Sequence, residues 1–379
     1  MVATFFLRII SRVRSSDWLL NLAIFTLMLI GFSAIYSVAL SQEAGDFSTV
    51  KKQLVAAIIG VSLFIWIAAS NYRLLRNYTK IFYVSGIILL GSVLLFGSTI
   101  RGTTGWFKIL GFQFQPVEFM KIALIIALSA YFCRFSGRLA GIKQIVGSAV
   151  ITAVPVILTM LQPDFGSAMM LLSIWGVLLL FAGLQKKHLL ALAGCFLILG
   201  ALSWQFFLVD YQKSRIMTFL QPTADPLGQG YNVNQAIIAV GSGGWVGRGL
   251  GFGSQSQLKF LPESQTDFIF AVIAEELGFV GVCIVFLAFG ILFFRMYRQA
   301  TDTTDDFTGY LVVGIGTLIF VQFSVNSGMN LGLLPVTGLG LPLVSYGGSS
   351  LIVMLSMLGI VQSAAIHTRT SWHRTQYEV

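Results

Sequence analysis

The stretch TDFIFAVIAEELGFVGVCIVFLAFGILFF, residues 266–294, changes from a polar loop into one long apolar run. A membrane-spanning helix needs about 20 consecutive, mainly apolar residues, and the run at 267–294 is long enough. It also holds the acids Asp267, Glu275 and Glu276, although the whole chain has only 15 Asp and Glu. Because ionisable groups inside a span are costly, they are candidates for function. The stretch therefore predicts a span with a polar site at its beginning.

The composition of the whole chain agrees with this interpretation. Of the 379 residues, 56% are hydrophobic and 10% are charged, whereas a soluble protein is closer to one quarter charged. We therefore disfavour two soluble domains and expect an all-α polytopic membrane protein with about ten transmembrane helices. The ten apolar runs lie at 18–40, 53–70, 80–97, 116–133, 145–162, 165–184, 189–209, 267–294, 308–331 and 342–366.

The ends of the chain are expected to belong to the same membrane unit. The run 18–40 is longer than the apolar core of a cleaved signal peptide, so it is expected to be retained as the first span. We predict a single membrane domain over 1–379 with a short cytoplasmic tail at 367–379. Lys and Arg are more frequent in the loops that face the same side as the N-terminus, which puts both termini in the cytoplasm. The net charge of +9 lies in these short loops and does not indicate nucleic-acid binding.

The longest segment between spans is 210–266, which this topology places on the outer side. Long ordered loops in compact proteins are usually functional, and aromatic residues and the patch 236–240 favour order here. YNVNQAIIAVGSGG, residues 231–244, predicts a short helix ended by glycines. The glycine-rich segment 241–257 lacks the strand and the Gly-Lys-Ser/Thr of a nucleotide loop. It is interpreted as a close-packed loop that offers backbone donors and Arg248 to an anion.

The three acids of the opening stretch separate on a straight helix. Asp267 is expected to cap or begin the helix at the outer mouth. Glu275 and Glu276 then lie up to two turns deeper and point in different directions, so neither forms a close carboxylate pair with Asp267. From spacing alone, Asp267 is as consistent with a helix cap as with a functional acid, and packing or hydrogen bonding is favoured for the glutamates.

Three further segments carry polar groups near span ends. Glu118 and Lys121 are i,i+3 neighbours, which suits either mutual neutralisation or a pocket for a charged head group. Asp164, in LQPDFG, suits a turn cap, and its outer position also lets it face the same cavity as Asp267. LPVTGLGLPLVSYGGSS at 334–350, which includes Ser345, is typical of a broken helix that lines a cavity. The scattered Cys and His residues do not suggest a disulfide or a metal site.

These patterns leave two classes of protein open. One is a transporter with a polar site near the membrane midplane. The other is an enzyme whose acids act at the outer membrane surface. The long outer loop and the outer positions of Asp164 and Asp267 favour the enzyme modestly.

Five motifs, spread over nearly the whole chain, resemble the SEDS family of bacterial cell-wall proteins. They are FQPVEFMK, LQPDFGSA, DPLGQGYNVNQAIIAVGSGG, SQSQLKFLPESQTDFIFAVIAEELGF and LPLVSYGGSS. YQKSR, TDFIFAVIAEELGFVG and IHTR look more similar to the RodA-like elongation members than to the FtsW-like division members.

The resemblance implies a ten-span peptidoglycan glycosyltransferase in the bacterial cytoplasmic membrane. Members polymerise lipid II on its outer face and work with a class B penicillin-binding transpeptidase and other elongation-complex membrane proteins. Asp267 matches the family's essential aspartate, Glu118 and Lys121 match its P-x-E-x-x-K pair, and Asp164 matches the aspartate of its QPD motif. Because the sugar linkage inverts, a base is required, and Asp267 is the candidate.

The leaving pyrophosphate needs positive charge, for which Lys121, Arg215, Arg248 or a divalent cation, Mg²⁺ or Mn²⁺, are the candidates. No organic cofactor is expected. A lipid II flippase would share the broken helices and the substrate and stays an alternative. A non-catalytic scaffold for the transpeptidase is a third possibility.

The chain departs from the family pattern at a few positions. Gly105 stands before Trp106 where members often carry Arg. Ser264 and Gln265 replace a positive pair, and Arg248 replaces a lysine. These changes put the affinity for a pyrophosphate-bearing substrate in doubt but leave Asp267 in place.

Overall fold

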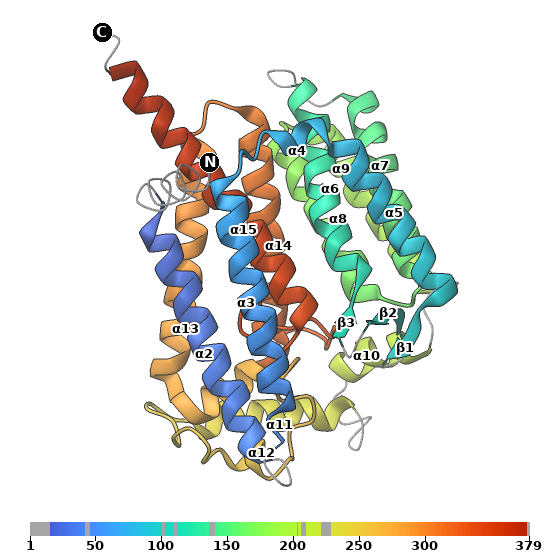
Figure 1. The fold of residues 1–379 in the computed structure, drawn as a ribbon. Coiled ribbons are helices and arrows are strands. Elements are labelled where there is room, and N and C mark those ends of the chain that lie inside the picture. Colours follow the sequence, from blue (N-terminus) through green and yellow to red (C-terminus); the bar gives the residue numbers. More distant parts are fainter. Residues whose placement is uncertain are drawn as a thin grey trace.

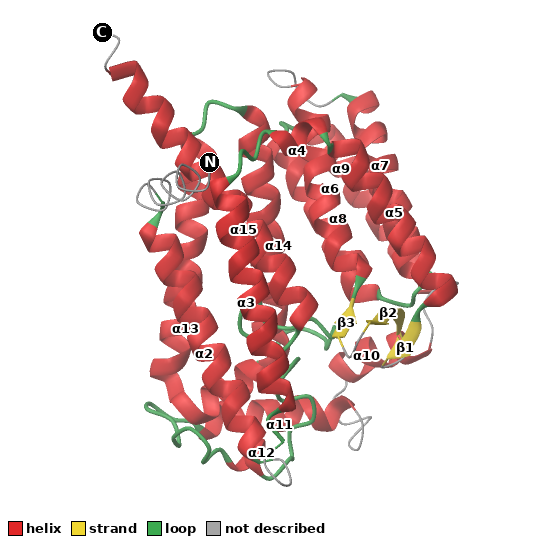
Figure 2. Ribbon diagram, in the orientation of Figure 1, coloured by secondary structure: helices red, strands yellow, loops and turns green. Residues whose placement is uncertain are grey.

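A computed structural model shows a bundle of long helices with smaller elements at one end (Figure 1). It describes residues 16–41, 46–100, 103–109, 112–135, 141–202, 204–205, 210–220 and 229–376. Helices dominate the described residues, and strands occupy one small region (Figure 2).

In the part of the chain that the structure describes, each of the ten apolar runs overlaps a helix, which confirms the predicted fold class. The helices are α2 (Trp18–Leu40), α3 (Ser48–Ala69), α5 (Thr79–Phe96), α6 (Pro116–Phe132), α7 (Ile142–Met160), α8 (Phe165–Phe181), α9 (Lys186–Leu202), α13 (Ile269–Asp302), α14 (Asp306–Asn330) and α15 (Gly348–Gln376). Within the described residues, 8 helices are long and apolar enough to cross a membrane, and α8 is a shorter apolar helix. The chain is therefore a multi-span membrane protein.

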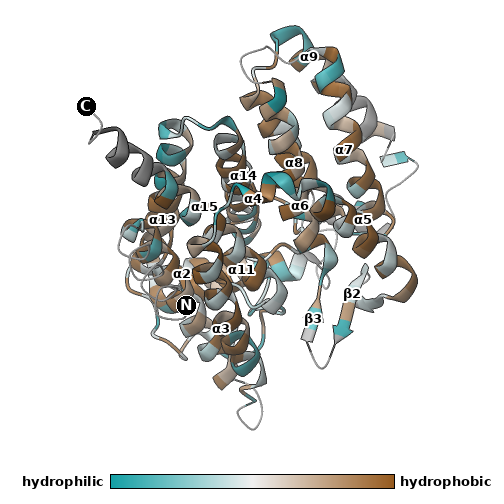
Figure 3. Cartoon of the chain, turned by 45° about the horizontal axis from the view of Figure 1, so that its top comes forward, coloured by the Kyte–Doolittle hydropathy of each residue, from teal (hydrophilic) through white to brown (hydrophobic). Residues whose placement is uncertain are grey.

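Local sequence signals account for several helix starts. Asp17 caps α2 by accepting a hydrogen bond from the backbone N–H of Leu20, and α6 begins with Pro116, which needs no N–H partner there. The helices are apolar around most of their circumference, as Figure 3 shows by the brown colour of the spans. An all-round apolar surface is expected for helices surrounded by lipid and by one another.

The long helices form two groups, which α14 and α6 connect. In one group α15 packs along α3 and α13 packs along α2; in the other α5 packs on α6 and α7 on α8. α14 contacts α13 in the first group and both α6 and α8 in the second. The two groups stand side by side in Figure 1.

The elements outside the spans gather at the end of the bundle opposite the chain termini, here named the loop end (Figure 1). They are α10 (Asp210–Leu220), α11 (Gln229–Ser242), α12 (Ser254–Gln257) and the antiparallel strands β1 (Ser98–Ile100), β2 (Thr103–Ile109) and β3 (Phe112–Phe114). The short α4 (Leu74–Asn77) joins α3 to α5. α11 confirms the helix predicted around 231–244, whereas the small sheet was not predicted.

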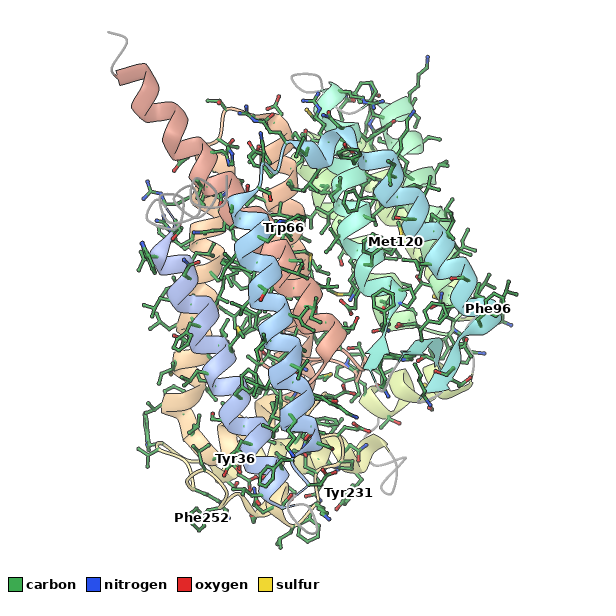
Figure 4. The ribbon with its side chains drawn as sticks, in the orientation of Figure 1. Tyr36, Trp66, Phe96, Met120, Tyr231 and Phe252 are labelled. Carbon is green, nitrogen blue, oxygen red and sulfur yellow. The ribbon has the colours of Figure 1, made fainter. Side chains whose placement is uncertain are left out.

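Side chains mark the two ends of the bundle in Figure 4. Tyr36, Phe96 and Phe252 lie toward the loop end, and Trp66 lies toward the other end. Met120 of α6 lies at about the level of Trp66, in the other helix group, and is fully buried. Aromatic residues near the ends of spans are typical of the membrane–water interface.

The straight helix predicted for 267–294 is wrong. α13 contains a break at Gly278, where φ is 66° and ψ is −164°. An added Cβ at Gly278 would collide with the backbone N of Gly247, so the loop 243–249 packs directly on the break. The backbone N–H groups of Phe279 and Val280 donate to carbonyls of this loop, at 2.9 and 3.0 Å. The part before the break is a separate short helix.

Candidate active site

A cavity of about 660 Å³ at the loop end is lined by residues from both helix groups. It brings together four of the residues singled out from the sequence, Glu118, Asp164, Asp267 and Ser345. Segments that are far apart in the chain meet here, so the cavity is a product of the tertiary fold. The prediction that Asp164 faces the same cavity as Asp267 is confirmed.

Asp267 lies in the turn before α13 and is half-buried. The N-cap position of α13 is occupied by Phe268, so the prediction that Asp267 caps this helix is wrong. The backbone carbonyl of Asp267 instead accepts hydrogen bonds from the side-chain amides of Asn326 and Asn330, at 2.9 and 3.0 Å. These bonds fix the main chain at the residue whose carboxylate lines the cavity.

The segment from Pro335 to Gly347 forms another wall and has no helical structure. Ser345 Oγ donates to the carbonyl of Thr266 at 2.6 Å and accepts from the N–H of Leu341 at 2.7 Å. The Gln53 side-chain amide bonds the carbonyl of Ser345 and the N–H of Gly347, at 3.3 and 3.1 Å. The predicted broken backbone is confirmed, and Ser345 joins it to the turn that carries Asp267.

This segment also reaches well into the first helix group. An added Cβ on Gly31, in the middle of α2, would meet the carbonyl O of Val344 at 2.5 Å. Only glycine allows such an approach of two backbones. The segment therefore touches α2 about 14 Å from the end of that helix at Leu40, at 1.5 Å per residue.

Glu118 and Lys121 form an ion pair with Nζ and Oε1 2.8 Å apart. Their side chains are 8% and 1% exposed, respectively. Glu118 lines the cavity, whereas Lys121 lies behind it and does not. Lys121 is thus placed to neutralise Glu118.

Asp164 caps α8, as its position in LQPDFG predicted. Its Oδ1 accepts from the N–H of Ser167 at 2.9 Å and its Oδ2 from the Ser167 hydroxyl at 2.7 Å. The side-chain amide of Gln115 also donates to Oδ2, at 3.2 Å. This carboxylate is therefore held in a fixed orientation at the cavity edge.

Of the two arginines proposed for the leaving group, Arg248 does not line the cavity. Arg248 is exposed and its guanidinium donates to Ser254 Oγ at 3.0 Å, away from the cavity lining. Arg215 is on α10, but its side chain lies outside the described part of the structure.

A lysine not singled out from the sequence takes their place. Among the described residues that line the cavity, Lys52 is the one Lys or Arg. The acids Glu118, Asp164, Glu263 and Asp267 line the same cavity. The sequence held a signal for this residue. Lys52 lies at the loop end of α3, which is the outer side in the predicted topology, where Lys and Arg are less frequent.

Four helices begin at the cavity. Residues at or just before the first turns of α6, α8, α13 and α15 line it, namely Gln115, Asp164, Asp267 and Gly347. The first N–H groups of a helix are unpaired within it and carry partial positive charge. The cavity is therefore suited to an anion in spite of its carboxylates.

The predicted divergence of Glu275 and Glu276 is wrong. Glu275 accepts from the N–H groups of Gln255 and Ser256, at 2.8 and 3.1 Å, and Glu276 accepts from the hydroxyls of Ser37 and Ser256, at 2.6 and 3.2 Å. Both carboxylates thus hold α12, because the loop folds back over the helix. Ser37 lies close to the loop end of α2, so the glutamates are also not deep in the bundle. Their predicted structural role is confirmed.

Two of the positions that depart from the family pattern, Ser264 and Gln265, line the cavity. The Gln265 carbonyl accepts from the N–H of Tyr346 at 2.8 Å. Burial raises the pKa of the Tyr346 phenol, which keeps it protonated. Gly105 is in β2, and an added Cβ there would meet Gln162 Oε1 at 3.2 Å. The adjacent Trp106 lines the cavity.

Comparison with known proteins identifies this arrangement. The model of the cell cycle protein family that comprises FtsW, RodA and SpoVE matches residues 17–370. The chain belongs to this SEDS family.

Its SEDS relatives carry related names. A probable peptidoglycan glycosyltransferase FtsW of Xanthomonas oryzae pv. oryzae is 36% identical over 354 residues, covering 92% of this chain and 72% of the relative. The peptidoglycan glycosyltransferase MrdB of Escherichia coli K12 is 37% identical over 352 residues, covering 90% and 92%. Stage V sporulation protein E of Bacillus subtilis is 34% identical.

Solved SEDS structures share the fold. A chain from a structure described as the coordination of polymerization and crosslinking by a peptidoglycan synthase complex matches with a TM-score of 0.78 at 32% identity, covering 93% of this chain and 98% of the other. The rod shape determining protein RodA of Thermus thermophilus matches with a TM-score of 0.69 at 29% identity, covering 92% and 96%.

Proposed function

We propose that this protein polymerises lipid II into β-1,4-linked glycan strands and releases undecaprenyl pyrophosphate. As a SEDS protein whose relatives are named peptidoglycan glycosyltransferases, the chain is a glycosyltransferase. The observation that carries the finer proposal is the position of Asp267 in a cavity where four helices begin.

The reaction is a single displacement at the anomeric carbon of the donor. The 4-hydroxyl oxygen of the acceptor forms a bond to that carbon while the bond from the carbon to the pyrophosphate oxygen breaks. The hydroxyl proton passes to the carboxylate of Asp267, and the bonding electrons leave with the pyrophosphate. Because attack and departure occur on opposite faces, the α-linked donor gives a β-linked product.

Asp267 suits the role of base because its main chain is held while its carboxylate lines the cavity. Glu118 is less suited, since its carboxylate is already paired with the Lys121 ammonium 2.8 Å away. Asp164 is less suited because three hydrogen bonds already occupy its oxygens.

Lys52 and the helix N-termini at the cavity supply positive charge to the departing pyrophosphate. This replaces the earlier candidates Arg248 and Lys121, which do not line the cavity. Preorganised charge of this kind, in a site partly shielded from water, is an effective way to stabilise a leaving group.

A divalent cation, Mg²⁺ or Mn²⁺, is part of the proposal. Within the described residues, no group of three or more His, Cys, Asp and Glu side chains is arranged to hold a metal ion. Mg²⁺ usually binds through substrate phosphates and one or two carboxylates, so Asp267 or Asp164 together with the pyrophosphate fits it. The cation would neutralise charge on the leaving group.

The cellular setting extends the proposal. The excess of Lys and Arg near the termini favours a cytoplasmic location for both, which puts the cavity at the outer face of the bacterial cytoplasmic membrane. A class B penicillin-binding transpeptidase is the proposed partner, supported by the likeness to a synthase that coordinates polymerization and crosslinking. The motifs YQKSR and IHTR favour the elongation role, with other elongation-complex membrane proteins as partners, over division.

The test is polymerisation of lipid II by the purified protein, with and without the transpeptidase. Asp267→Ala should make no glycan while it stays folded. Asp302→Asn, which changes an exposed acid at the far end of α13, should polymerise like the wild type. An inhibitor of unrelated transferases controls for contaminants.

Two outcomes would contradict the proposal. If folded Asp267→Ala polymerises at the wild-type rate, Asp267 is not the base. If the wild type moves lipid II across vesicle membranes without forming glycan, the protein is a flippase.

A further inference from the structure

α14 carries three side-chain amides on one face. Gln322, Asn326 and Asn330 are spaced at i, i+4 and i+8, which aligns them along a helix. Their residues are 4%, 0% and 0% exposed, in a helix that is otherwise mainly apolar. We call these three residues the amide ladder.

The amide ladder donates to the two irregular backbone segments that form the cavity. Asn326 Nδ2 donates to the carbonyls of Asp267 and Leu339, at 2.9 and 2.7 Å. Gln322 Nε2 donates to the carbonyl of Gly340 at 2.9 Å. Asn326 therefore joins the turn at Asp267 to the opposite wall through a single side chain.

Asn330 makes two different bonds to the region around Asp267. Its Nδ2 donates to the Asp267 carbonyl at 3.0 Å, and its Oδ1 accepts from the N–H of Ala271 at 3.2 Å. One side chain thus binds a carbonyl on the turn before α13 and an N–H in the first turn of that helix. The angle between the turn and the helix is fixed from both sides.

These bonds answer a physical requirement. Carbonyls in irregular backbone within a membrane protein need donors, because neither lipid nor a regular helix supplies them. A ladder of amides on an adjacent helix supplies donors in a fixed row. A row of apolar residues would fill the same space but would leave the carbonyls at 267, 339 and 340 without these partners.

We propose that Asn326 and Asn330 are positioning residues for the glycosyl transfer, and that they set where the Asp267 carboxylate stands relative to the segment 339–347. This rests on the proposed function, in which Asp267 is the base. The asparagines do not touch substrate; they act through the main chain of Asp267. Loss of their donors should therefore impair the chemical step more than substrate binding.

The experiment compares three variants of the full-length purified protein. Asn330→Asp keeps an oxygen for the Ala271 N–H but loses the amide donor to the Asp267 carbonyl. Asn326→Leu removes both donors with little change in volume. Ser327→Ala is the matched control, because Ser327 is buried on the same helix and its hydroxyl has no hydrogen-bond partner among the residues that the structure describes.

Lipid II polymerisation, thermal unfolding and amide hydrogen exchange are measured for each. We expect kcat to fall at least ~10-fold in both asparagine variants, since a misplacement of about 1 Å can cost ~100-fold. KM should stay within about twofold. Exchange should accelerate in peptides that cover 264–271, and Ser327→Ala should match the wild type in every measurement.

The inference is overturned if the asparagine variants keep the wild-type kcat. It is also overturned if their loss of rate only follows a loss of folded protein, or if KM alone rises. If Asn326→Leu does not fold, the result for Asn330→Asp alone decides the test. If the wild type makes no glycan, the proposed function fails. If amide hydrogen exchange at 264–271 is unchanged in the asparagine variants, the positioning role of the amide ladder is refuted separately.

Discussion

Substitution of Glu118 and of Lys121, the two partners of the buried ion pair, should destabilise the protein to different extents. The side chain of Lys121 is 1% exposed and does not line the cavity, whereas that of Glu118 is 8% exposed and does. Glu118→Leu would leave an ammonium without a counter-ion or access to the cavity. Removing one partner of a buried pair costs about 3–5 kcal/mol, which is a large share of a typical stability of about 5–15 kcal/mol.

Lys121→Met should be the milder change. The carboxylate of Glu118 would then be unpaired, but it borders the cavity and can be hydrated or protonated there. We therefore expect a loss toward the lower end of the same range, about 3 kcal/mol or less. The double variant Glu118→Leu with Lys121→Met should recover most of the loss, because an apolar replacement of a buried pair is often neutral or stabilising.

The assay is reversible unfolding of purified protein in detergent, which gives the free energy of unfolding of each variant. Arg298→Gln is the control, because Arg298 and Asp302 form a largely exposed pair with N and O 4.0 Å apart. Its loss should cost less than about 1 kcal/mol. Two results would refute the reasoning: single variants no less stable than this control, or a double variant that loses the sum of the single losses.

The activity of the double variant then separates the two interpretations of the pair. If it is stable and still polymerises lipid II, the two residues only neutralise each other's charge. If it is stable and inactive, Glu118 contributes to the cavity directly.

Two further predictions concern the break in α13 and the cap of α8. Gly278→Ala should lower the free energy of unfolding by more than about 1 kcal/mol, since alanine is strained at a φ of 66° and its Cβ would collide with Gly247. Gly290→Ala, in the same helix with open space around it, should be neutral or slightly stabilising. If the two variants have equal free energies of unfolding, the result argues against the break. Asp164→Ala should lower the free energy of unfolding by about 1 kcal/mol through loss of the N-cap, whereas Asp164→Asn should keep most of this stability. Both variants are measured by the same unfolding assay. An Asn variant as unstable as the Ala variant would show that the charge of Asp164 stabilises the protein, and not its role as a cap.

The sequence predicts the spans because lipid imposes a simple rule. Each long apolar run has to become a helix, since a helix pairs its own backbone groups in hydrocarbon. The same reasoning predicts that the irregular, polar segment 334–350 lines a cavity, and it does. These predictions need only local composition.

The site depends on long-range packing and is less accessible from sequence. Arg248 and Lys52 are both cations on the loop-end side, but only the fold shows that Lys52 lines the cavity while Arg248 bonds Ser254. Glu275 and Glu276 point apart on a helical wheel, yet both bind α12 because the loop covers that side of the helix. The strands at 98–114 are short and lack a clear alternating pattern.

The amide ladder shows an intermediate case. Gln322, Asn326 and Asn330 are visible in the sequence as polar residues at i, i+4 and i+8 within an apolar run. That spacing indicates a polar stripe, and a polar stripe in a span needs partners. The sequence does not reveal that the partners are main-chain carbonyls at 267, 339 and 340, because those carbonyls are present in every chain.

The position of Asp267 in the cavity depends on the geometry of α13. A straight α13 of 34 residues would be about 51 Å long, far more than the ~30 Å hydrocarbon core of a bilayer, so a part of it has to leave the span or bend. The break at Gly278 leaves Phe279 to Asp302, about 36 Å, as the span. The short helix before it is then free to pack against α14, where the amide ladder holds its first turn. The turn before this short helix thereby places Asp267 against the segment 335–347, in the cavity at the loop end. Gly278, which takes no part in the chemistry, thus determines which groups Asp267 can meet.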